Sequence, residues 1–121
     1  MFFKTHIRWV KVISEFDFKN QFQKDVIKPL NIDGLDVLAV NTNSQLKVFE
    51  KLCPHQKASL HSATCNNGEV ICPWHKYGFD LNTGRDLSTS GNALKVYTTK
   101  KEDEYWFVGV EVKLPFWMDQ A

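Results

Sequence analysis

Four side chains that can bind a metal occur as two short pairs in the middle of the chain. Cys53 and His55 form a C-x-H motif, and Cys72 and His75 form a C-x-x-H motif. The 16 residues between the motifs, 56–71, contain Asn67-Gly68, a pair that favours a tight hairpin turn. Because a hairpin of this length can fold back on itself, we expect the two motifs to face each other and bring two thiols and two imidazoles to one site.

Two kinds of metal site use this ligand set. Zinc is often bound by two cysteines and two histidines, but zinc fingers usually place both cysteines in one motif and both histidines in the other. Here each motif supplies one ligand of each type. Two such loops can each give a thiolate to one iron and an imidazole to the other, as a [2Fe–2S] centre with two histidines on one iron requires. We therefore favour an iron–sulfur cluster and keep a structural zinc site as the alternative.

The residues after the second motif carry a family resemblance. Phe79-Asp80 and Thr83-Gly84 follow Cys72-Pro73-Trp74-His75. This pattern resembles the Rieske-type ferredoxins that feed electrons to bacterial oxygenases, such as ring-hydroxylating dioxygenases and toluene-monooxygenase-like systems. The resemblance implies an all-β, Rieske-type fold for a single domain spanning 1–121. In that fold a small cluster-binding subdomain, at about 51–80, is inserted into a base β-sandwich or barrel.

The same resemblance implies one Rieske-type [2Fe–2S] cluster per chain. It assigns Cys53 and Cys72 to the inner iron, and His55 and His75 to the outer, solvent-facing iron. Two neutral imidazoles in place of two thiolates remove about two negative charges, which raises the reduction potential into the range of about −150 to +300 mV. The surface histidines are then the natural exit for the electron.

Several missing groups indicate where in this range the potential lies. High-potential relatives carry a disulfide at the positions of Ala58 and Trp74, and hydroxyl groups at those of Tyr77 and Phe79 that stabilise the reduced cluster. This chain cannot form the disulfide, and Phe79 has no hydroxyl group. Fewer hydrogen bonds to sulfur stabilise the reduced cluster less. We therefore expect a potential at the low end.

Charged and aromatic residues next to the ligands suggest a docking surface. Lys57 and Lys76 stand where the family commonly has glycine, and together with Lys51 they would favour an acidic docking partner. The alternative is that they are ordinary solvated lysines. Trp74 either shields the irons from water or anchors a redox partner.

We interpret the chain as a one-electron carrier that passes electrons from a reductase to a terminal oxygenase. Docking is expected to be transient, at the face that carries His55 and His75, and the protein is expected to be a monomer. It is not expected to be an enzyme itself, because it has no substrate domain, no mononuclear iron site and no nicotinamide or flavin motif. The alternatives are a cluster-bearing accessory subunit, similar to the small subunit of assimilatory nitrite reductases, and the structural zinc module.

Composition excludes several other classes of protein. Fifteen Lys and Arg balance fourteen Asp and Glu, for a net charge of +1, so nothing points to nucleic-acid binding. Apolar runs are only a few residues long, whereas a membrane span needs about 20. The N-terminal residues do not resemble a signal peptide, and three cysteines are too few and odd in number for a disulfide framework. We therefore expect a cytoplasmic protein that is not bound to a membrane.

Period-two alternation of apolar residues, interrupted by turn residues, predicts short strands along most of the chain. An edge or base strand is expected at 7–13. Strand pairs are expected at 35–40 with 46–50, 63–65 with 69–71, 78–81 with 85–87, and 93–98 with 105–112. The charged segment 100–104 is predicted to be a solvated loop between the last two strands. One helix is predicted, at 16–27, because Phe18, Phe22 and Val26 are four residues apart and Pro29 follows.

The remaining candidate residues are given structural roles. Cys65 is expected to be a small buried side chain, His61 a surface or second-shell histidine, and His6 to have no special role. Trp9, Trp106 and Phe107 are expected in the core. The apolar segment 114–118 is expected to pack back on the base of the domain.

Overall fold

The computed structural model describes residues 3–54, 59–73, 78–87 and 93–115, which form three antiparallel sheets. One sheet has the strand order β1-β10-β9, the second β2-β3-β4-β8 and the third β5-β6-β7. The strands are β1 (Phe3–Ser14), β2 (Lys28–Ile32), β3 (Leu35–Thr42), β4 (Gln45–Phe49), β5 (Thr64–Asn66), β6 (Glu69–Ile71), β7 (Gly78–Asp80), β8 (Val96–Tyr97), β9 (Thr99–Glu102) and β10 (Tyr105–Pro115). The described helices are α1 (Glu15–Gln21) and the single 3-10 turn η1 (Leu60–Ser62), and neither is long enough to span a bilayer.

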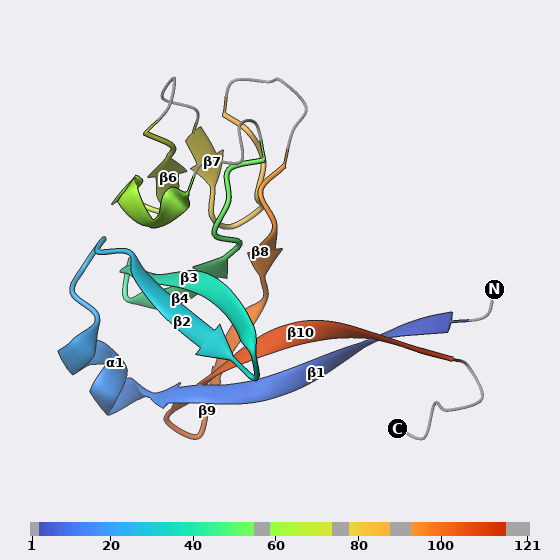
Figure 1. The fold of residues 1–121 in the computed structure, drawn as a ribbon. Coiled ribbons are helices and arrows are strands. Elements are labelled where there is room, and N and C mark those ends of the chain that lie inside the picture. The colour runs from blue at the N-terminus through green and yellow to red at the C-terminus, as the bar shows by residue number, and fades with distance from the viewer. Residues whose placement is uncertain (1–2, 55–58, 74–77, 88–92, 116–121) are drawn as a thin grey trace.

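The sheets are stacked along the molecule. In Figure 1, β6 and β7 lie at one end, the long ribbon of β1 and β10 lies at the other, and β2, β3 and β4 lie between them. We call the β6–β7 end the upper end and the β1–β10 end the base. This order explains why the central sheet must be apolar on both faces.

The central strand β3 contributes to two hydrophobic cores. Val37 and Ala39 belong to the base core, which is completed mainly by α1, β4 and β10. Leu38 and Val40 point the other way, into an upper core that contains all three cysteines. Because alternate residues of a strand face opposite sides, the continuous apolar run 37–40 is the expected pattern for a strand buried on both faces.

Tight turns with left-handed backbone angles set the register of the hairpins. Asn43-Ser44 joins β3 to β4, and Asn67-Gly68 joins β5 to β6, with φ between 49° and 83° at all four residues. Both hairpins were expected from the sequence and are confirmed. A third, Asp33-Gly34 between β2 and β3, was not predicted, although Asp-Gly is also a strong hairpin pair.

The predicted helix at 16–27 is wrong beyond residue 21. Ser14 caps α1 by accepting a hydrogen bond from the Asp17 amide at 3.1 Å, and the helix ends at Gln21. Asp25 has φ 60°, and its amide donates to the Asn41 carbonyl at 2.7 Å. The chain therefore leaves the helix to dock on β3, and Val26 stays largely exposed while Phe18 and Phe22 are buried.

The charged segment 100–104 is a strand and a turn rather than a loop. β9 covers Thr99–Glu102, and only Asp103 and Glu104 form the turn to β10. Lys100 lies over the Trp9 ring at 4.2 Å from its centroid, and Lys101 pairs with Glu15. These contacts hold the lysines in a strand, where their charge alone predicted a solvated loop. The strand expected at 93–98 is reduced to β8, which pairs with β4. The expected pairing of 93–98 with 105–112 is therefore wrong, because β10 pairs with β1 and β9.

Only one of the three aromatic residues assigned to the core is fully buried. Trp106 is 6% exposed and lies in the base core, whereas Phe107 is half-buried and Trp9 is 37% exposed. Trp9 pairs with Gly109 on the outer face of the β1–β10 ribbon, and a Cβ at Gly109 would lie 3.2 Å from the Trp9 ring. The indole therefore covers a bare glycine on the surface instead of entering the core.

Candidate metal centre

Each ligand motif falls in a segment whose flanking residues form an antiparallel pair, and the two segments, which we call the ligand loops, contain the same number of residues. The first loop is closed by a bridge between Leu52 and Ser59, and the second by the pairing of Ile71 in β6 with Gly78 in β7. Six residues, 53–58, lie inside the first pair and six, 72–77, inside the second. In each loop the cysteine is the first residue after the closing pair.

The two motif cysteines are buried in the same core. Cys53 and Cys72 are each 0% exposed and belong to the upper core, together with Leu60 and Phe79. None of the three cysteines forms a disulfide. The hairpin β5–β6 connects the loops, as the sequence predicted, and brings two thiols that are 19 positions apart into one apolar environment.

The stems of the two loops are fixed by backbone contacts. The Leu60 amide donates to the Lys51 carbonyl at 2.8 Å across the first stem. At the second stem, the Leu87 amide donates to the Gly78 carbonyl at 2.9 Å. A Cβ at Gly78 would lie 2.9 Å from methyl groups of both Ile71 and Leu87, so any other residue would have to displace the ends of these two side chains at the stem.

The turn after the second loop also depends on glycine. The Gly84 amide donates to the Asp80 carbonyl at 2.6 Å, and the Gly84 carbonyl accepts from the Leu94 amide at 2.7 Å. Gly84 has φ 79°, and the Leu94 carbonyl oxygen lies where a Cβ would be placed, so this position has no room for a side chain. The Thr83-Gly84 element of the sequence motif thus fastens the segment after β7 to the segment before β8.

Several residues predicted at the site lie outside the described part of the chain. They are the ligand candidates His55 and His75, the candidates for second-shell or docking roles Lys57, Trp74, Lys76 and Tyr77, and Ala58. Part of the predicted apolar tail, from residue 116 on, also lies outside it. Within the described ranges no group of three or more His, Cys, Asp or Glu side chains is arranged to hold a metal ion. The structure therefore places the two cysteines and the loop stems but does not test the complete ligand set.

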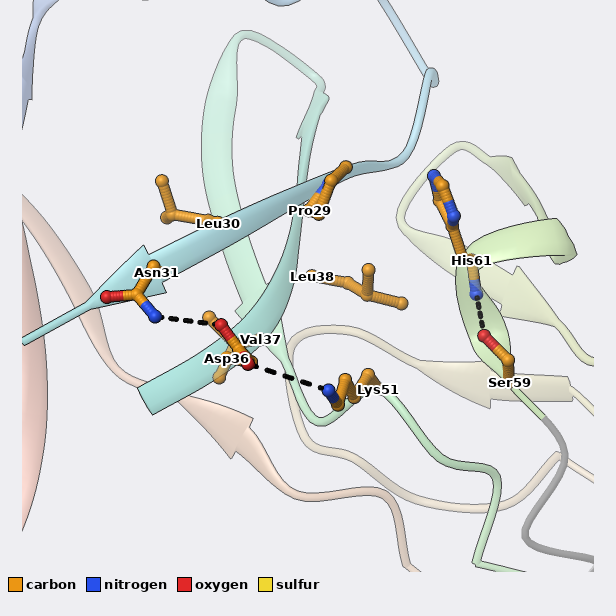
Figure 2. Close-up of a pocket in the computed structure, with 9 residues that line it drawn as sticks. All are labelled: Pro29, Leu30, Asn31, Asp36, Val37, Leu38, Lys51, Ser59 and His61. Carbon is orange, nitrogen blue, oxygen red and sulfur yellow. Dashed lines mark hydrogen bonds and ion pairs between the residues drawn. The ribbon is translucent and has the colours of Figure 1, made fainter. Parts of the chain in front are cut away.

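A cleft of about 500 Å³ runs beside the first loop stem (Figure 2). Ser59 and His61 lie on one side and Pro29 and Leu38 face them from the central sheet, with Lys51 nearby. His61 is exposed, as the sequence predicted. Lys51 lies 3.8 Å from the Asp36 carboxylate, so its charge is partly balanced on this flank.

Cys65, the third cysteine, is buried as expected and differs chemically from the other two. Its thiol donates a hydrogen bond to the Asp25 carboxylate at 3.6 Å. Burial and the neighbouring Asp25 charge raise the pKa of the Cys65 thiol to about 11. At neutral pH it is therefore a protonated thiol, whereas a metal ligand must be a thiolate.

The buried donors fit a metal cluster. A thiolate among apolar side chains is costly unless a positive partner compensates it, and iron would provide that partner for Cys53 and Cys72. Cys65, in contrast, is held as a protonated thiol by its hydrogen bond to the Asp25 carboxylate. The structure thus separates two cysteines that suit a cluster from one that does not.

Comparison with known proteins points in the same direction. A family model described as "Rieske [2Fe-2S] domain" matches residues 8–98. The chain is 31% identical over 104 residues to Ferredoxin CarAc of Metapseudomonas resinovorans, which covers 84% of this chain and 94% of that protein. It is 33% identical over 73 residues to human Apoptosis-inducing factor 3, but it spans only 12% of the length of that protein.

A solved structure shares the fold. The chain superimposes with a TM-score of 0.69 and 27% identity on a chain of the "Complex of reduced oxygenase and oxidized ferredoxin in carbazole 1,9a-dioxygenase". The match covers 88% of this chain and 96% of the other. The arrangement of sheets described above is therefore shared with a chain of this oxygenase–ferredoxin complex.

Proposed function

Because this chain belongs to the Rieske [2Fe-2S] domain family, we propose that it is a one-electron carrier that serves a terminal oxygenase. The observation that carries this proposal is the pair of equal six-residue loops, each of which starts with a fully buried cysteine of the same core. The bound [2Fe–2S] cluster would supply the redox chemistry, accepting and releasing a single electron. The protein would hold that cluster and position it for a partner without catalysing a reaction on a substrate.

The proposed ligands are Cys53, His55, Cys72 and His75. The two cysteines would hold the inner iron, since they are enclosed by the upper core. The histidines follow them by two and three positions, within the same loops, and would hold the outer iron. We propose one domain over 1–121, with a cluster-binding subdomain at about 51–80 that corresponds to the two loops and the sheet between them.

The proposed partners are a reductase and a terminal oxygenase. The solved complexes of ferredoxin with the oxygenase of carbazole 1,9a-dioxygenase support the second of these. Docking would take place at the face of His55 and His75, with Lys57, Trp74, Lys76 and Tyr77 around it. We further propose a monomer in the cytoplasm, where a reducing environment would keep the three cysteines from forming disulfides.

Replacement of each cysteine in turn tests the ligand assignment. Cys53→Ala and Cys72→Ala are expected to lose iron and acid-labile sulfide almost completely. Cys65→Ala is the matched control, because Cys65 is also buried in the upper core, and it is expected to retain both. Equal loss of iron and sulfide in all three variants would contradict the assignment.

The carrier function is tested by counting electrons. Reduction of the purified protein is expected to consume one electron for every two irons, and reoxidation should restore the original spectrum. Gel filtration of the same sample tests the monomer. Reduction without a change in the visible spectrum, or zinc in place of iron, would overturn the proposal.

A further inference from the structure

A buried hydroxyl group connects the central sheet to the hairpin between the two ligand loops. Thr42, the last residue of β3, is 1% exposed, and its Oγ1 accepts a hydrogen bond from the Gly68 amide at 2.8 Å. The two residues are 26 positions apart in the sequence. A buried hydrogen bond of this kind is expensive to break, because both polar groups would lose their partners away from water.

Gly68 is held by both of its backbone polar groups. Its amide is bound to Thr42, and its carbonyl accepts from the Leu81 amide at 2.8 Å. Gly68 is at the turn into β6, and β6 pairs with β5 on one side and β7 on the other. Cys72 follows β6 directly, and pairing on both sides restrains β6, so we expect a displacement of Gly68 to move Cys72 as well.

A second connection runs beside the first. The Cys65 thiol in β5 donates a hydrogen bond to the Asp25 carboxylate at 3.6 Å. Asp25 is itself fixed, because its amide donates to the Asn41 carbonyl at 2.7 Å. The raised pKa of Cys65 keeps the proton on sulfur that this hydrogen bond requires.

We infer that Thr42, Cys65 and Asp25 are positioning residues that fix Cys72 at the metal centre. They do so by fastening the β5–β6 hairpin to the central sheet, and we call these hydrogen bonds the hairpin anchor. The inference rests on the proposed function in so far as Cys72 is a cluster ligand. The inference adds that Thr42 in β3 and Asp25 before β2 help to determine the position of Cys72. Both residues are far from Cys72 in the sequence, so the motif around Cys72 does not indicate their role.

The test compares an isosteric variant with a conservative one. Thr42→Val keeps the volume of the side chain and removes the hydroxyl group, whereas Thr42→Ser keeps the hydroxyl group. In the cluster-loaded protein, Thr42→Val is expected to shift the electron paramagnetic resonance g values and the reduction potential, and to bleach in air several times faster than wild type. Thr42→Ser should restore all three properties. Cys65→Ala, which removes the second connection, is expected to keep the cluster and to show a smaller shift of the same kind.

A control separates positioning from general loss of stability. Val48→Ala removes buried volume from the base core and does not touch the hairpin anchor. It should lower the thermal stability while leaving the g values and the potential as in wild type. If Thr42→Val also leaves them unchanged, or if Val48→Ala shifts them equally, the inference is wrong.

Amide hydrogen exchange tests the anchor without relying on the cluster. The Gly68 amide is expected to exchange slowly in wild type and in Thr42→Ser, and at least tenfold faster in Thr42→Val. Exchange of Gly68 that is equally fast in all three proteins would overturn the inference. A wild-type protein with protected Gly68 and no cluster would instead contradict the proposed function and leave the anchor standing.

Discussion

Two glycines with similar backbone angles have different surroundings. Gly34 has φ 91° and Gly84 has φ 79°, a region that residues with a side chain rarely adopt. A Cβ on Gly34 would meet no atom within 4 Å, whereas on Gly84 it would collide with the Leu94 carbonyl oxygen. Substitution of these two glycines by alanine therefore distinguishes the cost of backbone strain, which both share, from the cost of a steric clash, which only Gly84 has.

Gly34→Ala is expected to cost about 1 kcal/mol of unfolding free energy, from backbone strain alone. Gly84→Ala should cost at least about 2 kcal/mol more, since the backbone of the following segment must also move. Denaturant unfolding of both variants measures the difference. Equal losses would show that the Leu94 segment gives way without cost, and that Gly84 does not fasten it.

Glu15 is a buried carboxylate held by two donors. Lys101 Nζ lies 2.7 Å from one of its oxygens, and the Trp106 indole donates to the other at 3.1 Å. The hydrogen bond from Lys101 and then that from Trp106 lower the pKa of Glu15 from its ordinary value of 4.5, against the opposing effect of burial. The ionised form is therefore favoured by folding.

The sign of the resulting pH dependence follows from the lowered pKa. Glu15 contributes stability above pH 4.5, and this contribution is lost as the pH falls through its lower folded-state pKa. Glu15→Gln is expected to cost about 1 kcal/mol at pH 7 and progressively less in acid. Unfolding curves from pH 7 to below pH 4 check this. A difference that stays constant with pH would contradict the account.

At the scale of elements, the start and the end of α1 have different causes. Ser14 is a local N-cap, which the sequence could indicate. The end is imposed from a distance, since Asn41 Nδ2 donates to the Phe22 carbonyl at 3.1 Å and the Asn41 carbonyl accepts from Asp25. The helix predicted from residue spacing extended to residue 27, because the local pattern does not reveal these tertiary contacts.

The Ser14 N-cap is expected to make a measurable contribution to the free energy of unfolding. Ser14→Ala should lower the unfolding free energy by about 1 kcal/mol, and Ser14→Asp should recover most of it, because aspartate is also a good N-cap. Thermal unfolding of the two variants is the measurement. If the aspartate variant is as unstable as the alanine variant, the side-chain cap is not what stabilises the start of α1.

Other elements show what a sequence can and cannot indicate. The hairpins at Asn43-Ser44 and Asn67-Gly68 were predictable because their turns are encoded locally. β2 was not predicted, although Asp33-Gly34 follows it. It contains Pro29 and is an edge strand, where proline is tolerated. The spacing of the two motifs indicated facing loops, but the hairpin anchor joins residues 26 and 40 positions apart and had no sequence signal.

At the scale of the whole molecule, the all-β, Rieske-type fold predicted from the sequence is confirmed. Its two cores differ in kind. The base core is built on long strands and α1, whereas the upper core packs the three-residue strands β5, β6 and β7 against β3 and β4 and includes three cysteines. We therefore expect the stability of the upper core to depend more on the bound cluster than that of the base core does.

This difference leads to an expectation for cluster removal. Stripping iron and sulfide should speed amide exchange in β5, β6 and β7 by about tenfold or more, while β1 and β10 change little. Exchange measured on loaded and stripped protein, residue by residue, checks this. A uniform increase over both cores would show that the molecule opens as one unit and that the loops are not stabilised separately.

The central claim, that two buried cysteines and two histidines hold a [2Fe–2S] cluster, is tested most directly by spectroscopy of the purified protein. We expect a brown protein whose visible absorption bleaches partially with dithionite. Its reduced form should give a low-temperature electron paramagnetic resonance signal whose average g lies below that of an all-cysteine [2Fe–2S] cluster, as expected for mixed cysteine and histidine ligation. A colourless protein that contains zinc, and stays colourless after anaerobic incubation with iron and sulfide, would contradict the claim.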